Sequence, residues 1–144
     1  MARSTMRLDL SGFEELLDKL EEVGGDLKPV VTDALEQAGE TIEWDTKDAV
    51  SASNLPAKGK YSKGATYRSI VSNPKVEWTA GVASIGVGFD YGKEGAGGYL
   101  ITGTPKMKPD QALLTMYKKK KYMNKIRAEM SEIVNEAIID IMEG

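Results

Sequence analysis

The sequence predicts an α+β fold: an antiparallel sheet of three to five strands with two N-terminal helices and a long C-terminal helix packed on it. Apolar residues recur at helical spacing before residue 50, at every second position in the middle of the chain, and at helical spacing again after residue 123. The links between the central segments have hairpin length, which favours antiparallel pairing. Because 144 residues are enough for one core, we expect a single domain over residues 1–144.

The first predicted helix begins at a capping-box spacing. Ser11 stands three residues before Glu14, so we expect Ser11 as the N-cap and Glu14 as the side chain that reaches back to it. Gly24 and Gly25 are expected to end this helix. Its apolar stripe consists of Phe13, Leu16, Leu17, Leu20 and Val23.

The second predicted helix is capped by Asp26 and carries Pro29 in its first turn, where a missing N–H group costs little. We expect it to run to about Val50. Its apolar stripe consists of Val30, Val31, Ala34, Leu35, Ala38, Ile42 and Ala49.

Residues 51–65 contain turn formers and lysines without any period, so we expect an exposed loop at about these positions. Long loops in compact domains are commonly functional or disordered. Two interpretations stay open: a plain surface loop in an isolated subunit, or a loop that becomes ordered on contact with a partner.

Four strands are expected in the middle of the chain. The clearest has Ala83, Ile85, Val87 and Phe89 on one face, with small residues between them. The Asn73-Pro74 step is a turn signal, and the glycine-rich residues 92–98 form a connection. The four predicted strands are residues 67–71, 75–78, 83–89 and 99–101.

The last third of the chain predicts one long amphipathic helix. Its apolar positions are Met123, Ile126, Met130, Ile133, Val134, Ala137, Ile138 and Ile141. Residues 111–117 are either an earlier turn of this helix or a separate short helix. The apolar run of residues 99–101 and the Gly-Thr-Pro and Met-x-Pro steps after it look like a strand end that leads into this helical region.

The composition argues against catalysis. The chain contains neither cysteine nor histidine, so disulfides, thiolate chemistry and the commonest general base and metal ligand are excluded. The acidic side chains have the spacing of solvated helix faces, and the glycines near residues 86–98 lack the strand-to-helix context of a nucleotide loop. We therefore expect no enzyme, no catalytic residue, no cofactor and no metal.

No apolar run approaches the roughly 20 residues that span a bilayer, so we expect no transmembrane helix and no membrane partner. The N-terminal residues have no apolar stretch behind Arg3, which is unlike a secretory signal. Synthesis in the cytoplasm is the expectation that follows.

Charge is segregated along the chain although the net charge is only −3. Residues 8–50 carry thirteen acidic side chains and three lysines, whereas residues 106–127 carry eight basic side chains and one acid. The tail, residues 128–143, is acidic again. Either the fold brings these patches together within one subunit, or they pair with complementary surfaces on other molecules.

The run Lys118–Lys121 is flanked by Tyr117 and Tyr122, a combination that binds phosphates and stacks on bases in some nucleic-acid-binding proteins. The chain as a whole is acidic, however, and the run lies where a helix N-terminus prefers anions. We therefore expect the lysines to pair with an acidic partner surface, such as residues 8–50 of an adjacent subunit. A small nucleic-acid-binding regulatory protein that uses this run is the alternative function.

Four short motifs follow one another along the chain. They are a Leu-x-Gly-hydrophobic-x-x-Leu helix start, a Gly-x-x-x-x-Ser-Ile step, a Val-Gly strand ending and a Tyr-x-x-x-Gly-Thr-x-x-Met-x-Pro segment. This order resembles the tail-component family of long-tailed bacteriophages, which are head–tail joining or tail-completion proteins. The motifs are matched by residues 10–16, 63–70 and 85–88, and by Tyr99, Gly103, Thr104, Met107 and Pro109.

The resemblance implies a structural protein of the virion neck, made in the host cytoplasm. It would form a ring, a hexamer or alternatively a dodecamer, that terminates the tail tube or joins it to the head connector. Its partners would be itself, the head connector or adaptor proteins and the tail tube protein. DNA would pass without specific binding, and an acidic lumen suits that task because it repels phosphates.

The candidate interface residues come from three places: the lysine run, the family-like segment around residue 104, and the exposed loop. They are Lys58, Lys60, Tyr61, Tyr99, Thr104, Met107, Lys118, Lys119, Lys120 and Lys121.

Overall fold

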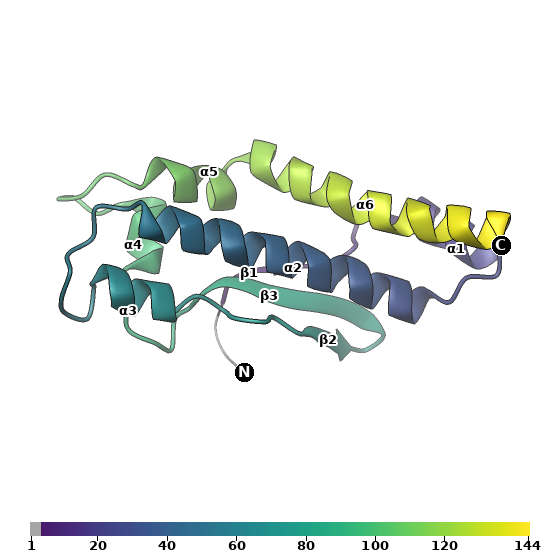
Figure 1. Cartoon of the computed structure of the whole chain (residues 1–144), viewed down its shortest axis with the longest axis horizontal. Helices are drawn as coiled ribbons and strands as arrows, with labels where there is room; N and C mark the ends of the chain where they lie inside the picture. The colour runs from purple at the N-terminus through teal and green to yellow at the C-terminus, as the bar shows by residue number, and fades with distance from the viewer. Residues whose placement is uncertain (1–3) are drawn as a thin grey trace.

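The computed structural model describes residues 4–144 and has the expected α+β class (Figure 1). Three strands form one antiparallel sheet in the order β1-β3-β2. The strands are β1 (Ser4–Leu8), β2 (Val76–Thr79) and β3 (Val82–Asp90). The helices are α1 (Glu14–Glu22), α2 (Leu27–Ser51), α3 (Lys63–Arg68), α4 (Gly97–Thr102), α5 (Gln111–Lys118) and α6 (Lys120–Glu143).

Two long helices dominate the molecule. Figure 1 shows α2 and α6 side by side and antiparallel, with the sheet against the other side of α2 and α1 beside the end of α6. The core fills both contacts, and its largest fully buried side chains include Leu35, Ile42, Ile85, Ile126 and Met130. Gly39 of α2 faces β3, where an added Cβ would lie 2.9 Å from Ile85 Cδ1, so the glycine allows the close contact of helix and sheet.

The central strand confirms the prediction for residues 83–89, because Ala83, Ile85, Val87 and Phe89 are all buried. The strand β1 was not predicted. Its five residues form a strand because Leu8 pairs with Ile85 across the sheet, an interaction between residues far apart in the sequence. Residues 75–78 were expected as a strand, and β2 lies there with its bounds shifted by one residue.

The two N-terminal helices form as expected, but the capping box does not. The Asp26 side chain accepts a hydrogen bond from the Lys28 N–H group, which confirms the cap of α2. Ser11 is not the N-cap of α1, because its N–H group donates to Asp9 Oδ1 at 2.9 Å and Gly12 has a φ of +92°. The helix therefore begins at Glu14, whose carboxylate accepts from the N–H group of Gly12.

The expected strand at residues 67–71 is wrong, because α3 covers most of it. The Ser62 side chain accepts a hydrogen bond from the Ala65 N–H group and caps this helix. Only Ile70 retains a strand-like bridge, to Phe89. The exposed loop is consequently shorter than the expected 51–65: it lies between α2 and α3, and within it Ser53 and Ser62 are buried.

The expected strand at residues 99–101 is also wrong, because these residues belong to α4. This helix packs against β3 so closely that a Cβ on Gly97 would collide with the Phe89 ring. The segment after it is a turn rather than a strand end, since Thr104 and Met107 pair through two backbone hydrogen bonds of 2.8 and 3.1 Å. Asp110 then caps α5.

The C-terminal helix is confirmed, and residues 111–117 are a separate helix, α5. The two helices are divided at Lys119, whose backbone is extended with φ −105° and ψ 147°. Ile126, Met130, Val134 and Ile138 are the buried stripe of α6, whereas Ile141 at its end is 38% exposed. Within residues 4–144, no helix combines the length and apolarity needed to cross a membrane.

Candidate interaction surfaces

Few of the segregated charges form ion pairs within the subunit. Among residues 4–144 two ion pairs form, Arg7 with Glu77 at 3.3 Å and Lys47 with Glu43 at 2.6 Å. Neither joins the acids of residues 8–50 to the bases of residues 106–127. Arg127 approaches the acidic N-terminal segment, where it donates to the Ser11 carbonyl oxygen. Of the two interpretations of the charge pattern, this favours pairing with other molecules.

The charges also separate along the long axis of the molecule. At one end lie the loop between α2 and α3 and the turn between α4 and α5 (Figure 1), which together carry Lys58, Lys60, Lys106 and Lys108. At the other end lie α1, the start of α2 and the end of α6, which carry mostly acids. A subunit with unlike ends can contact a second copy head to tail.

The lysine run occupies the corner between α5 and α6, and we call Lys118–Lys121 the lysine corner. All four side chains are exposed, and none has an ion-pair partner among residues 4–144. The expected placement at a helix N-terminus holds for only part of the run. Lys118 ends α5, where the helix dipole favours a cation, while Lys120 and Lys121 lie in the first turn of α6. Each of these last two placements costs about 0.3–1 kcal/mol when exposed.

Two tyrosines beside the lysine corner point into the fold rather than toward a ligand. The Tyr117 hydroxyl lies 2.6 Å from Thr46 Oγ1, and the Tyr122 hydroxyl donates to Asp45 Oδ2 at 2.6 Å. Burial raises the pKa of Tyr117, and burial together with the hydrogen bond to Asp45 raises the pKa of Tyr122. Both tyrosines therefore hold the corner against α2. Their rings are not directed outward to stack on bases, as a nucleic-acid site would require.

Three of the expected interface residues gather at the basic end. The rings of Tyr61 and Tyr99 meet edge to face, with centroids 5.8 Å apart, although their segments are far apart in the sequence. Lys60 Nζ lies 5.1 Å from the Tyr61 ring, and both tyrosines are nearly half exposed, at 44% and 48%. Exposed tyrosines of this kind are enriched at contact surfaces.

The remaining expected interface residues lie close to this end. Lys58 is exposed in the same loop as Tyr61, and Thr104 is exposed in the turn after α4. Met107 is half-buried and packs against the main core, so part of its role is structural.

A groove between α2 and α6 was missed by the sequence analysis. It has a volume of about 570 Å³, and its walls combine the exposed Trp44 with carboxylates from both helices. The acidic members are Glu40, Asp45, Glu129, Glu132 and Glu136. They come from two segments about 90 residues apart, so only the packing of α2 against α6 brings them together.

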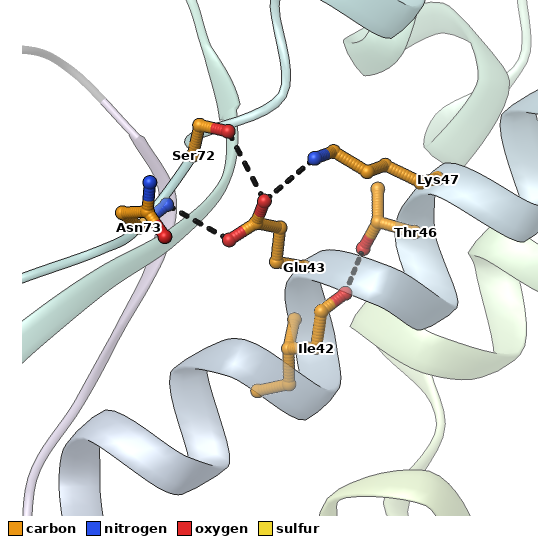
Figure 2. Close-up of polar contacts among 6 residues, drawn as sticks. All are labelled: Ile42, Glu43, Thr46, Lys47, Ser72 and Asn73. Atoms are coloured by element: carbon orange, nitrogen blue, oxygen red, sulfur yellow. Dashed lines mark hydrogen bonds and ion pairs between the residues drawn. The ribbon is translucent and has the colours of Figure 1, made fainter.

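The charged group with the least exposure, Glu43, holds the fold together (Figure 2). It is 6% exposed, and its carboxylate accepts hydrogen bonds from Lys47 Nζ at 2.6 Å, from the Asn73 N–H group at 2.8 Å and from the Ser72 hydroxyl at 3.1 Å. Burial alone would raise the pKa of this carboxyl, but the hydrogen bonds outweigh burial and lower it. Glu43 therefore clamps the loop before β2 onto α2.

The same stretch of α2 contains a second polar contact. Thr46 Oγ1 donates to the Ile42 carbonyl oxygen at 2.6 Å, as Figure 2 shows, so its contact with Tyr117 is a hydrogen bond donated by the tyrosine. Within residues 4–144, no three Asp or Glu side chains are grouped as a metal site. These polar groups are thus satisfied by one another and serve packing.

Comparison with known proteins found no match to this chain. No protein-family model matches the chain, and no curated protein and no solved structure was found similar to it. What the protein does is therefore inferred from the charge, exposure and contacts of its own residues.

Proposed function

We propose that this protein is a structural subunit of the bacteriophage neck. In this proposal it forms a ring, of six or alternatively twelve copies, that terminates the tail tube or joins it to the head connector. The head connector or adaptor proteins and the tail tube protein are its other partners, and DNA passes through the ring. The protein is made in the host cytoplasm, becomes part of the virion and has no catalytic role.

The observation that carries the proposal is the unlike charge that remains unpaired within the subunit. Thirteen acidic side chains of residues 8–50 and eight basic side chains of residues 106–127 form no ion pair with one another. Leaving like charges together costs self-repulsion, which contact with the opposite charge of a neighbour relieves. Because every copy carries both patches, head-to-tail contacts repeat, and they close into a ring when the rotation between copies allows it.

Two further observations are consistent with a neck protein. The Tyr61–Tyr99 pair and Lys60 form an exposed surface at one end of the subunit, which suits contact with the next component of the neck. The chain carries a net charge of −3, and an acidic surface around a channel repels DNA phosphates and lets the duplex slide. The resemblance of the four sequence motifs to tail-completion proteins points to the same assembly.

The experiment that tests the proposal is a stop codon at Tyr61 in the phage genome that encodes the chain. Lysates are examined by negative-stain electron microscopy, and a plasmid copy of the full chain serves as the control. The proposal expects DNA-filled heads beside separate tails, with joined virions restored by the plasmid. Normal, infectious virions without the plasmid would overturn it.

The second candidate is a small nucleic-acid-binding regulatory protein. One observation favours it, namely four exposed lysines without ion-pair partners at the lysine corner. The inward hydroxyl bonds of Tyr117 and Tyr122 count against it, because the flanking rings are used inside the fold. Binding to duplex DNA is measured at increasing salt. This candidate expects measurable retention that falls steeply with salt, whereas the neck protein expects no retention at moderate salt.

A further inference from the structure

We propose that the groove between α2 and α6 of one copy receives the lysine corner of a neighbouring copy. This inference rests on the proposed ring and deepens it, because it names the two faces that meet. The faces are the lysine corner, Lys118–Lys121, and the acidic groove, lined by Glu40, Trp44, Asp45, Glu129, Glu132 and Glu136.

The groove has the shape and charge to bind ammonium groups. It is a concavity of about 570 Å³, and none of its five carboxylates has an ion-pair partner among residues 4–144. Glu132 and Glu136 are four residues apart on α6, a spacing at which like charges repel on a helix. An occupant of opposite charge removes this repulsion.

Trp44 adds an aromatic wall to the groove. Its side chain is 54% exposed, and within the subunit Lys47 Nζ already lies 4.6 Å from the centre of its ring. An ammonium group over an indole face is attracted by the ring and loses less on desolvation than it would against aliphatic carbon. The groove therefore provides carboxylates beside an exposed indole, whose ring Lys47 of the same copy already approaches.

The lysine corner is exposed and is held in place by contacts with α2. Its backbone is extended at Lys119, so the four side chains spread from a break between two helices. The hydrogen bonds of Tyr117 to Thr46 and of Tyr122 to Asp45 hold this break against α2 on both sides. A corner fixed in this way loses little backbone freedom when it docks.

The occupant must come from another molecule. Lys121 and Glu129 lie on the same helix and are separated by eight residues, which is about 12 Å along the axis, and Glu132 and Glu136 lie farther along it. Within one copy, Tyr122 brings the corner only to Asp45, and the corner lysines leave Glu129, Glu132 and Glu136 without an ion pair among residues 4–144. A second copy is the occupant that the chain itself supplies, with four positive charges for five negative ones.

The first test reverses the charges in two variants. The corner variant carries Lys118→Glu, Lys119→Glu, Lys120→Glu and Lys121→Glu, and the groove variant carries Glu129→Lys, Glu132→Lys and Glu136→Lys. Self-association is measured by sedimentation velocity at low and high salt, after circular dichroism has verified folding. Each variant alone should associate at least roughly tenfold more weakly than the wild type. An equimolar mixture should recover association, because each variant then offers the charge that the other lacks.

The matched control reverses charge at the other basic surface, at two lysines rather than four. The Lys58→Glu, Lys60→Glu variant keeps both the corner and the groove, so by itself it should associate like the wild type. A corner variant or a groove variant that associates like the wild type, or a mixture of the two that stays dissociated, would overturn the inference. So would an equally large loss of association in the control, because the loss would then reflect net charge rather than this contact.

A second test does not depend on strong association. The chain has no cysteine, so Lys120→Cys on one copy and Glu132→Cys on another introduce the only thiols in the mixture. Mild oxidation should link the two copies at least roughly tenfold faster than it links Lys58→Cys with Glu132→Cys. Equal rates of linking would refute the contact between copies. Equal rates are also the result expected if the groove instead binds a basic segment of a different protein.

The two proposals fail in distinguishable ways. If the charge-reversal and thiol tests succeed but the associated species is a closed two-fold dimer, the contact stands and the ring is wrong. If the stop codon at Tyr61 separates heads from tails while the corner and groove variants both restore joined virions, the neck function stands and this contact is wrong.

Discussion

The clamp at Glu43 offers the sharpest test of how this fold is held together, and the perturbation is Glu43→Ala. The substitution removes the acceptor of three hydrogen bonds, from Lys47, Ser72 and the backbone of Asn73. It also leaves the Lys47 ammonium, whose side chain is only 13% exposed, without its carboxylate. The cost is therefore dominated by groups left unpaired rather than by lost contacts.

The magnitude follows from that count. Removing one partner of a buried ion pair typically costs about 3–5 kcal/mol, and the partial exposure of Lys47 places Glu43→Ala near the lower value, at about 3 kcal/mol. For a chain of this size, such a loss corresponds to a fall in Tm on the order of 10 °C. Glu43→Gln keeps an acceptor for the Asn73 N–H group, so its loss should be smaller, about 1–2 kcal/mol.

The assay is urea denaturation followed by circular dichroism, with Glu40→Ala as the matched control. Glu40 lies on the same helix but is exposed and has no ion-pair partner among residues 4–144, so its replacement should change the free energy of unfolding by less than about 0.5 kcal/mol. If Glu43→Ala costs no more than Glu40→Ala, the clamp is not a stabilising element and the reasoning is refuted.

The pH dependence of the same variants provides an independent check. Because the pKa of Glu43 is lowered in the folded state from the ordinary value of 4.5, its contribution is fully present above that value. It is lost as the pH falls through the folded-state pKa. The stability difference between the wild type and Glu43→Gln should therefore shrink on acidification, and a difference that is constant with pH would contradict the assigned charge.

Other elements lead to further predictions. Gly97→Ala should lower the free energy of unfolding by about 1–3 kcal/mol, because its Cβ meets the Phe89 ring. Gly98→Ala should cost less, because its Cβ would lie 3.6 Å from Tyr91 Cε1, and equal losses in urea denaturation would contradict the close contact of α4 with β3. Tyr122→Phe should cost about 0.5–1.5 kcal/mol, because Asp45 loses its donor, and no loss would mean that the bond is not formed in solution. The raised pKa values of Tyr117 and Tyr122 imply stability that is present below the ordinary value of 10 and is lost as the pH rises above it. The Tyr117→Phe, Tyr122→Phe double variant should therefore lose the late part of the alkaline absorbance titration, and an unchanged curve would refute the assignment.

Elements whose local signals agree with one another were predicted well. The second helix has its cap, its proline in the first turn and a continuous apolar stripe, and α2 differs from the prediction by one residue at its C-terminal end. The apolar alternation of residues 83–89 and the stripe of α6 were equally reliable, because burial selects the same residues that the period marks. In each case one face of the element meets the core over most of its length, although Ile141 at the end of α6 is exposed.

The wrong elements have two causes, namely tertiary contacts and local side-chain caps that the apolar period does not show. Residues 67–71 and 99–101 have strand-like compositions, but the cap at Ser62 and the contact of Gly97 with the Phe89 ring make α3 and α4 helical. The strand β1 is too short to show a period and exists because β3 pairs with it. The capping box failed because Asp9 takes the N–H group that the pattern assigned to Glu14.

Some features of the surface could be predicted from the sequence, and others depend on how distant segments pack. The exposure of Lys118–Lys121 and the segregation of charge follow from the sequence, because long charged side chains stay in water unless they are paired. The groove of α2 and α6 and the meeting of Tyr61 with Tyr99 do not follow from it, since each joins segments that are far apart in the chain. The inward direction of Tyr117 and Tyr122 likewise required the position of α2.

The sequence by itself determined the α+β class, the two long helices, the central strand and the separation of acidic from basic segments, because these properties depend on local periods and composition. Only the tertiary structure decided which of those charges face one another, which tyrosines are exposed and where a concave surface lies. The physical reason is that side-chain partners are chosen by the packing of distant elements. In this chain the antiparallel packing of α2 against α6 leaves the acids in a groove and the lysines at a corner.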